Sequence, residues 1–131
     1  MRKYVLISIG GFVGAIFRYL FTESSFLSMN FPVKVFIINI LGSLLLAFFL
    51  TLTFAHWSIN PNLRIGIATG FFGAFTTFST FCKDTIILII QNDYITAFLN
   101  ILLSIVVGLI SAYIGIIIGR EIIKKKEKHY D

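Results

Sequence analysis

Long apolar runs separated by short polar segments are the dominant pattern along this chain. They cover about residues 4–22, 33–55, 63–90 and 95–119. A membrane hydrocarbon core about 30 Å thick is crossed by about 20 apolar residues in a helix, so each run is long enough to span it. Because backbone polar groups that face lipid must be paired within their own segment, all four runs are predicted to be helices.

The four predicted spans occupy most of the 131 residues and leave no room for a soluble domain. We therefore expect a four-helix transmembrane domain over residues 1–119 and a basic cytoplasmic tail over residues 120–131. The first run is similar to a secretory signal because Arg2 and Lys3 precede it, but Arg18 interrupts it and three further spans follow. We expect this first helix to be retained rather than cleaved.

The composition agrees with lipid as the main solvent of this chain. It is 57% hydrophobic and 13% charged, whereas a soluble domain has about 25% charged residues, and its mean hydropathy is +0.93. This excludes an ordinary soluble enzyme or nucleic-acid-binding module, so we expect no enzymatic activity and no nucleic-acid partner. The one cysteine, Cys82, allows neither an internal disulfide nor a cysteine metal cluster.

The net charge of +5 bears on orientation in the membrane. Lys and Arg residues near helix ends concentrate on the cytoplasmic side. One predicted side carries Arg2, Lys3, Arg64, Arg120, Lys124, Lys125, Lys126 and Lys128, whereas only Lys34 lies in a loop on the other. We therefore expect a multi-pass protein of a bacterial plasma membrane with both termini in the cytoplasm and its basic tail near anionic lipid headgroups.

The third run carries the most informative polar residues, within Gly70–Phe81. Glycine weakens a helix, and Thr and Ser hydroxyls compete for backbone carbonyls, so a break in the middle of this span is predicted. Carbonyls released at membrane depth must line a cavity or bind something, and carbonyl clusters bind bare cations. A simple kink packed against neighbouring helices is the alternative.

Two aromatic residues in this segment, Phe78 and Phe81, are three positions apart and therefore share one helix face. An aromatic ring has a positive edge, which can stabilise an anion without carrying a charge. Thr77, Ser79 and Thr80 add hydroxyl donors beside the rings. Packing against lipid or within the core is the alternative for both rings.

Amides also occur inside two spans. Asn39 and Asn100 are each followed one turn later by a serine, Ser43 and Ser104, so both helices have a short polar stripe. An amide in a membrane helix either joins helices through hydrogen bonds or, as the alternative, directs its N–H groups into a polar pathway.

The ionisable residues within the spans, Arg18, Lys83 and Asp84, lie near the outer ends of their helices, where long side chains reach the interface. A proton-coupled exporter similar to the small multidrug resistance proteins needs a carboxylate deep in the first helix, and none occurs between Tyr4 and Phe21. A non-conducting membrane scaffold is a second alternative, but it would not need the hydroxyl-rich third run.

Three segments together resemble the CrcB/Fluc family of fluoride channels. Residues 10–19, GGFVGAIFRY, are similar to the family's GGxxGAxxRY, and residues 39–43, NILGS, to its NxxGS. Residues 70–81, GFFGAFTTFSTF, are similar to its long signature GfxGgxTTFSTF, with Ala74 in place of the usual glycine. Three further departures are Asp84, where many members have Glu, and Asn100 and Gly108, where relatives often have Tyr and Ser.

The resemblance implies a small four-helix subunit that pairs antiparallel with a second copy and forms two narrow fluoride pores. The residues that it assigns to the fluoride pore are Phe78, Phe81, Asn39, Ser79, Thr80, Asn100 and Ser104. The two phenylalanines would contact fluoride through their ring edges, and the others would line the path as polar groups. Arg18 and Asp84 are further candidates for a structural or functional role.

The family also holds a structural sodium ion at the dimer centre, on backbone carbonyls at the break in the third helix. Carried onto this chain, these carbonyls belong to Gly73 and Thr76, two from each subunit. Half a cation site in each chain is a reason to dimerise, because carbonyls left without partners in lipid are costly.

The partner of this dimer has two possible identities. An antiparallel homodimer needs the same chain to insert in both orientations, whereas the bias of Lys and Arg predicts a single orientation. We therefore expect the chain to pair either with itself or with an oppositely oriented homologue.

These residues together predict a passive channel that exports cytoplasmic fluoride and so lowers its toxicity. Fluoride is small and tightly hydrated, so its dehydration requires dense hydrogen-bond donors. Uncharged donors suit conduction, because an ion must be bound weakly enough to leave again.

Overall fold

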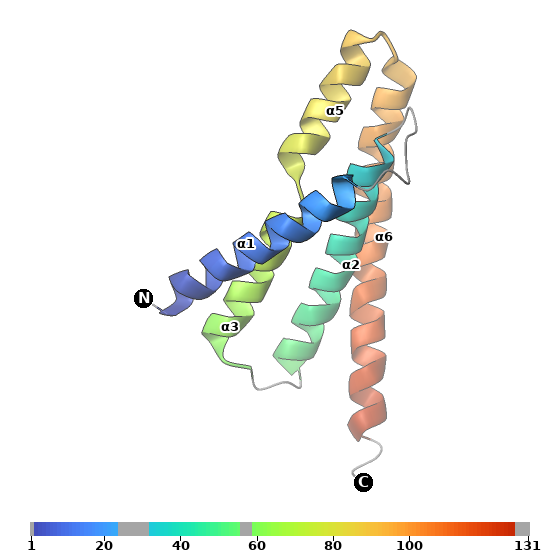
Figure 1. The fold of residues 1–131 in the computed structure, drawn as a ribbon. Helices are drawn as coiled ribbons and strands as arrows, with labels where there is room; N and C mark the ends of the chain where they lie inside the picture. Colours follow the sequence, from blue (N-terminus) through green and yellow to red (C-terminus); the bar gives the residue numbers. More distant parts are fainter. Residues whose placement is uncertain (1, 24–31, 56–58, 128–131) are drawn as a thin grey trace.

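The computed structural model describes residues 2–23, 32–55 and 59–127. Every regular element in these ranges is helical (Figure 1). Its elements, in chain order, are α1 (Arg2–Glu23), α2 (Val33–Ala55), α3 (Pro61–Ile65), the π-helix η1 (Gly66–Phe72), α4 (Gly73–Phe75), α5 (Phe78–Ile90) and α6 (Tyr94–Glu127). The elements from α3 to α5 form one bent span, so this part of the chain has four segments long and apolar enough to cross a membrane. The predicted all-helical architecture with an interrupted third span is confirmed.

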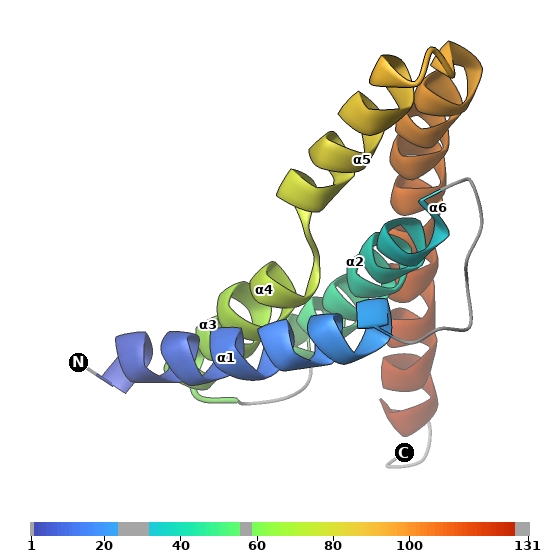
Figure 2. The same ribbon diagram turned by 45° about the horizontal axis from the view of Figure 1, so that its top comes forward.

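Glycines allow α1 to lie directly on the first half of the third span. A Cβ atom added to Gly10 would overlap the carbonyl oxygen of Gly66, and one added to Gly14 would overlap that of Phe71. Small residues at such positions permit backbones to approach closely, which is a main source of helix association in lipid. α1 therefore packs chiefly against η1 and α4, and both ribbon views show it lying across this half of the third span (Figures 1 and 2).

The second long contact joins α2 and α6, which run side by side in the same direction (Figures 1 and 2). A Cβ atom on Gly115 would overlap the carbonyl oxygen of Leu44. The buried hydroxyl of Ser111 donates to the carbonyl oxygen of Ile40 at 2.8 Å. Close backbone approach and an interhelical hydrogen bond thus hold these two helices at a fixed register.

The second half of the third span, α5, turns back sharply into α6. Asn92 adopts the left-handed conformation with a φ of 62°, and the amide of Asp93 donates to the carbonyl of Leu88 at 2.9 Å. This is the arrangement in which helices commonly end on a residue with positive φ. Because the turn is short, α5 and α6 are antiparallel neighbours at the top of Figure 1.

The last helix is longer than a membrane is thick. α6 has 34 residues, which at 1.5 Å per residue is about 51 Å, whereas the hydrocarbon core is about 30 Å thick. The helix continues without a break past residue 119 to Glu127. Arg120, Lys124 and Lys125 are therefore carried on a helical extension and are exposed.

Candidate functional site

The break in the third span is two residues long and extended. Thr76 ends α4 with a φ of −73° and a ψ of 155°, and Thr77 precedes α5 with a φ of −144° and a ψ of 120°. Figure 2 shows the resulting thin connection between α4 and α5. The predicted break therefore falls inside the hydroxyl-rich segment.

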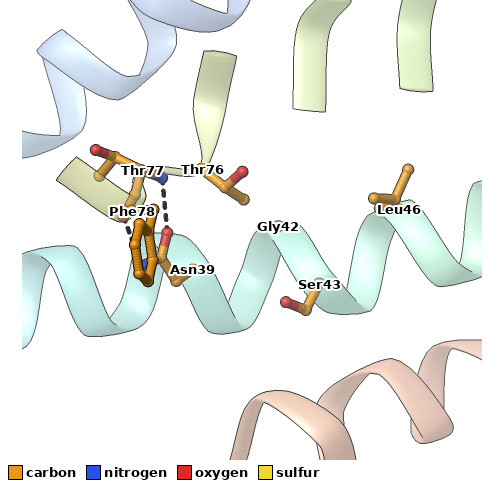
Figure 3. Close-up of a pocket in the computed structure, with 7 residues that line it drawn as sticks. All are labelled: Asn39, Gly42, Ser43, Leu46, Thr76, Thr77 and Phe78. Atoms are coloured by element: carbon orange, nitrogen blue, oxygen red, sulfur yellow. Dashed lines mark hydrogen bonds between the residues drawn. The ribbon is translucent and has the colours of Figure 1, made fainter. Parts of the chain in front are cut away.

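An amide on α2 holds this extended backbone. The Oδ1 of Asn39 accepts from the amide of Thr77 at 2.9 Å, and its Nδ2 donates to the carbonyl oxygen of Thr77 at 3.0 Å. Figure 3 shows Asn39 reaching from its helix to the Thr77 backbone. Both hydrogen-bonding groups of one extended residue are thus satisfied by one side chain. This is the joining role that was one of two alternatives for Asn39.

The side chain of Thr77 organises the first turn of α5. Its Oγ1 accepts from the amide of Thr80 at 3.2 Å, lies 2.9 Å from the Thr80 Oγ1 and lies 3.3 Å from the Ser79 Oγ. Three hydroxyl groups are therefore connected at the amino end of a helix, where the dipole is positive. This end of α5 favours a negative charge.

The two phenylalanine rings lie on the same side of α5, as their spacing predicts. The ring centroids of Phe78 and Phe81 are 5.8 Å apart, with an interplanar angle of 32°. Phe78 is 77% exposed in the single chain, whereas Phe81 is half-buried. The Phe78 ring borders an open pocket of about 250 Å³, whose other lining residues are Asn39, Gly42, Ser43, Leu46, Thr76 and Thr77 (Figure 3).

Close contact between α2 and the break shapes this pocket. The methyl group of Thr76 occupies the space where a Cβ atom on Gly42 would be. The Oγ1 of Thr76 donates to the carbonyl oxygen of Phe72 at 2.8 Å and so stays with the end of α4. The glycine at position 42 therefore lets the extended segment lie against α2 within reach of Asn39.

Two backbone carbonyls at the break lose the partners that a continuous helix would provide. The Gly73 carbonyl would accept from the amide of Thr77, which instead donates to Asn39. The Thr76 carbonyl would accept from the amide of Thr80, which instead donates to the Thr77 hydroxyl. A Cβ atom on Gly73 would meet nothing within 4 Å, so this residue borders open space.

Phe81, Ser79 and Thr80 lie outside the pocket lining, as do the remaining candidate residues. Asn100 is buried in the contact between α6 and α5, where its Nδ2 donates to the Oγ1 of Thr85 at 2.9 Å. The buried Oγ of Ser104, one turn further along α6, has no hydrogen-bond partner in the described part of the chain. Arg18 on α1 and Asp84 on α5 do not line the pocket.

Thr77 is the residue whose importance the sequence shows least. It was expected only to add a hydroxyl beside the rings, yet its backbone and side chain connect Asn39, Ser79 and Thr80. A threonine that directly precedes a helix is a common N-cap, and this position is the signal that identifies it.

Comparison with known proteins agrees with this arrangement. A family model described as "CrcB-like protein, Camphor Resistance (CrcB)" matches residues 5–116. This chain belongs to the CrcB family. The matched range contains α2, the break and most of α6, so every candidate residue named above lies within the part shared with the CrcB family.

Several curated relatives are similar over nearly their whole length. The "Fluoride-specific ion channel FluC" of Sulfurihydrogenibium sp. is 37% identical over 122 residues, which cover 92% of this chain and 98% of the relative. "Fluoride-specific ion channel FluC 1" of Bacillus cereus is 42% identical over 130 residues, covering 95% of this chain and 94% of the relative. The protein of the same name from Staphylococcus aureus is 40% identical over 119 residues, covering 89% and 96%.

Proposed function

We propose that this chain is the subunit of a fluoride channel that passively exports cytoplasmic fluoride. The observation that carries the proposal is the helix break, which gathers uncharged donors beside two aromatic rings at the amino end of α5. The printed names of relatives that match over nearly the full chain support fluoride as the ion.

The chemistry of these groups suits a small anion in transit. The Asn39 amide, the Ser79 and Thr80 hydroxyls and the edges of Phe78 and Phe81 offer partial positive charge without a fixed cation. Such contacts can replace water around fluoride and still release it, which conduction requires. The Ser104 hydroxyl, buried without a partner, adds a polar group on the neighbouring helix. We infer that fluoride moves along this polar surface.

The carbonyls of Gly73 and Thr76 are suited to a structural sodium ion. Both lose their helical partners at the break, and unwound carbonyls at membrane depth are groups that hold sodium in transporters. One chain supplies two such oxygens, which is fewer than a cation needs, so a second subunit would complete the site. Sodium would neutralise these oxygens and hold the two breaks together.

An antiparallel dimer is the assembly that these surfaces favour. Phe78 is 77% exposed in the single chain, and Gly73 borders open space, so both ends of the break can meet a partner. Basic residues at Arg64 and along the end of α6 favour one insertion direction with cytoplasmic termini. The partner is either a second copy in the opposite orientation or an oppositely oriented homologue.

Fluoride efflux from liposomes tests this proposal. Vesicles with purified protein, loaded with potassium fluoride, should release fluoride to an ion-selective electrode when valinomycin balances the charge, and should retain chloride in a parallel assay. Because a homologue is one possible partner, the assay is repeated with such a chain included. Efflux equal to that of protein-free vesicles in both preparations would refute the channel function.

The Phe81 ring has its own test in the same assay. Phe81→Ile keeps a large apolar side chain but removes the ring edge, so it should lower efflux strongly while the protein keeps its elution volume and melting temperature. Normal efflux from this variant would remove the ring from the mechanism.

A further inference from the structure

A buried polar contact connects α5 to α6 away from the pocket. The Nδ2 of Asn100 donates to the Oγ1 of Thr85 at 2.9 Å, and this oxygen donates to the carbonyl oxygen of Phe81 at 2.8 Å. Asn100 is 1% exposed and Thr85 is 7% exposed. The three groups form a continuous hydrogen-bonded chain from α6 to the backbone of Phe81.

We propose that Asn100 and Thr85 are positioning residues that set the rotation of α5 and thereby the direction of the Phe81 ring. A hydroxyl has one hydrogen, and Thr85 gives its hydrogen to Phe81, so the amide of Asn100 is the donor between the helices. The direction of each bond is therefore determined. The inference rests on the proposed channel function, because the direction of the Phe81 ring matters for efflux only if that ring contacts fluoride.

The surroundings of α5 explain why such a contact is needed. The helix packs chiefly against α6, and its amino end follows the extended residues Thr76 and Thr77. An extended connection transmits little of the orientation of α4, so the angle about the α5 axis depends on contacts further along the helix. Thr85 lies one turn beyond Phe81 on the same face, and a bond there fixes that face.

The register of the two helices supports this role. Because α5 and α6 are antiparallel, the residue one turn beyond Asn100 lies level with the residue one turn before Thr85. These two residues are Ser104 and Phe81. The buried Ser104 hydroxyl without a partner is therefore level with the Phe81 turn, at the end where α5 and α6 diverge (Figures 1 and 2).

Five variants and two measurements test the proposal. Asn100→Leu and Thr85→Val each remove the bond between the helices, and the double variant removes both polar groups. The control, Ser111→Ala, removes a different buried hydrogen bond of α6, to the carbonyl of Ile40 on α2 at 2.8 Å. Fluoride efflux per folded protein is measured beside the rate at which a maleimide labels Cys82, the one cysteine of the chain.

Each single variant is expected to lower fluoride efflux about three- to tenfold. This range corresponds to the free energy of one hydrogen bond between membrane helices. Cys82 is next to Phe81, so its labelling rate should change by at least about threefold if α5 rotates, whereas Ser111→Ala should leave it unchanged. The double variant should be no worse than either single variant, because both changes remove the same interaction. Thr85→Ser keeps the hydroxyl and should match the unmodified protein.

Three results would overturn the proposal. Full efflux from Thr85→Val with none from Asn100→Leu would mean that the Asn100 amide contacts fluoride itself. A loss of thermal stability alone, with normal efflux per folded protein and an unchanged Cys82 rate, would make the contact purely structural. If Thr85→Val does not fold, the double variant takes its place, because it leaves no unpaired amide. Normal fluoride efflux and a normal Cys82 labelling rate in the double variant would equally contradict the proposal.

Failure of the proposed function is a separate outcome. If the unmodified protein releases no fluoride with any partner, the channel proposal is wrong. The Cys82 labelling rates still decide whether Asn100 and Thr85 control the rotation of α5.

Discussion

Replacing Asn39 with leucine should destabilise the break directly. The change removes the hydrogen bonds of 2.9 and 3.0 Å to the backbone of Thr77, which is 6% exposed. A buried polar group left unpaired costs about 1–3 kcal/mol, whereas hydrogen bonds between membrane helices average about 0.6 kcal/mol because the unfolded chain finds other partners. For the two bonds together we expect a loss of about 1–4 kcal/mol in the free energy of unfolding. Fluoride efflux should fall with it.

Unfolding in mixed micelles with increasing SDS measures this free energy, and liposome efflux measures the activity of the folded fraction. Thr53→Val is the matched control, because it removes a buried hydroxyl of α2 that donates to Leu50 within the same helix at 3.2 Å. The control should change stability less than Asn39→Leu does, because the Thr53 hydroxyl bonds only to its own helix. If Asn39→Leu is as stable as this control, the amide does not hold the extended segment.

Three further changes test other parts of the fold. Gly14→Ala should lower stability by about 1–3 kcal/mol, because the new methyl group would overlap the carbonyl of Phe71, whereas Gly11→Ala, whose nearest contact is 3.9 Å away, should be nearly neutral in the same SDS titration. Thr77→Val should lower efflux while Thr77→Ser keeps it, because only the hydroxyl caps α5; equal efflux from both would contradict this role. Asn92→Val should lower the melting temperature and Asn92→Gly should not, since the φ of 62° excludes a β-branched residue; equal melting of both would contradict the turn.

The architecture could be predicted because it depends on the solvent more than on particular contacts. Apolar runs of the length of a membrane leave few options for the backbone, and Gly70–Phe81 contains too many glycines and hydroxyls for a regular helix. The π-helix at Gly66–Phe72 was not predicted, since the apolar pattern of this run does not distinguish a π-helix from an α-helix. The helical course of α6 to Glu127 was not predicted either, because the apolar pattern stops at the basic residues while the helix does not.

The candidate site was predictable where it depends on local spacing. Phe78 and Phe81 share a face because they are three residues apart, and the structure places their rings 5.8 Å from each other. The partner of Asn39 was not predictable, since Asn39 and Thr77 are 38 positions apart and no periodic signal in the sequence connects them. The same holds for Asn100 and Thr85, which meet only because a short turn folds α6 back along α5.

One rearrangement of hydrogen bonds accounts for both polar surfaces of the break. The amide of Thr77 donates to Asn39 instead of the Gly73 carbonyl. The amide of Thr80 donates to the Thr77 hydroxyl instead of the Thr76 carbonyl. Each exchange of partners satisfies an amide donor on the α5 side and leaves a carbonyl acceptor on the α4 side without its helical partner. The linked hydroxyl groups of α5 therefore lie at its amino end, where the dipole favours an anion, while carbonyl oxygens without helical partners remain at the end of α4, where a cation is favoured. A change that restores a continuous helix, by removing Asn39 or the Thr77 hydroxyl, should weaken both surfaces at once.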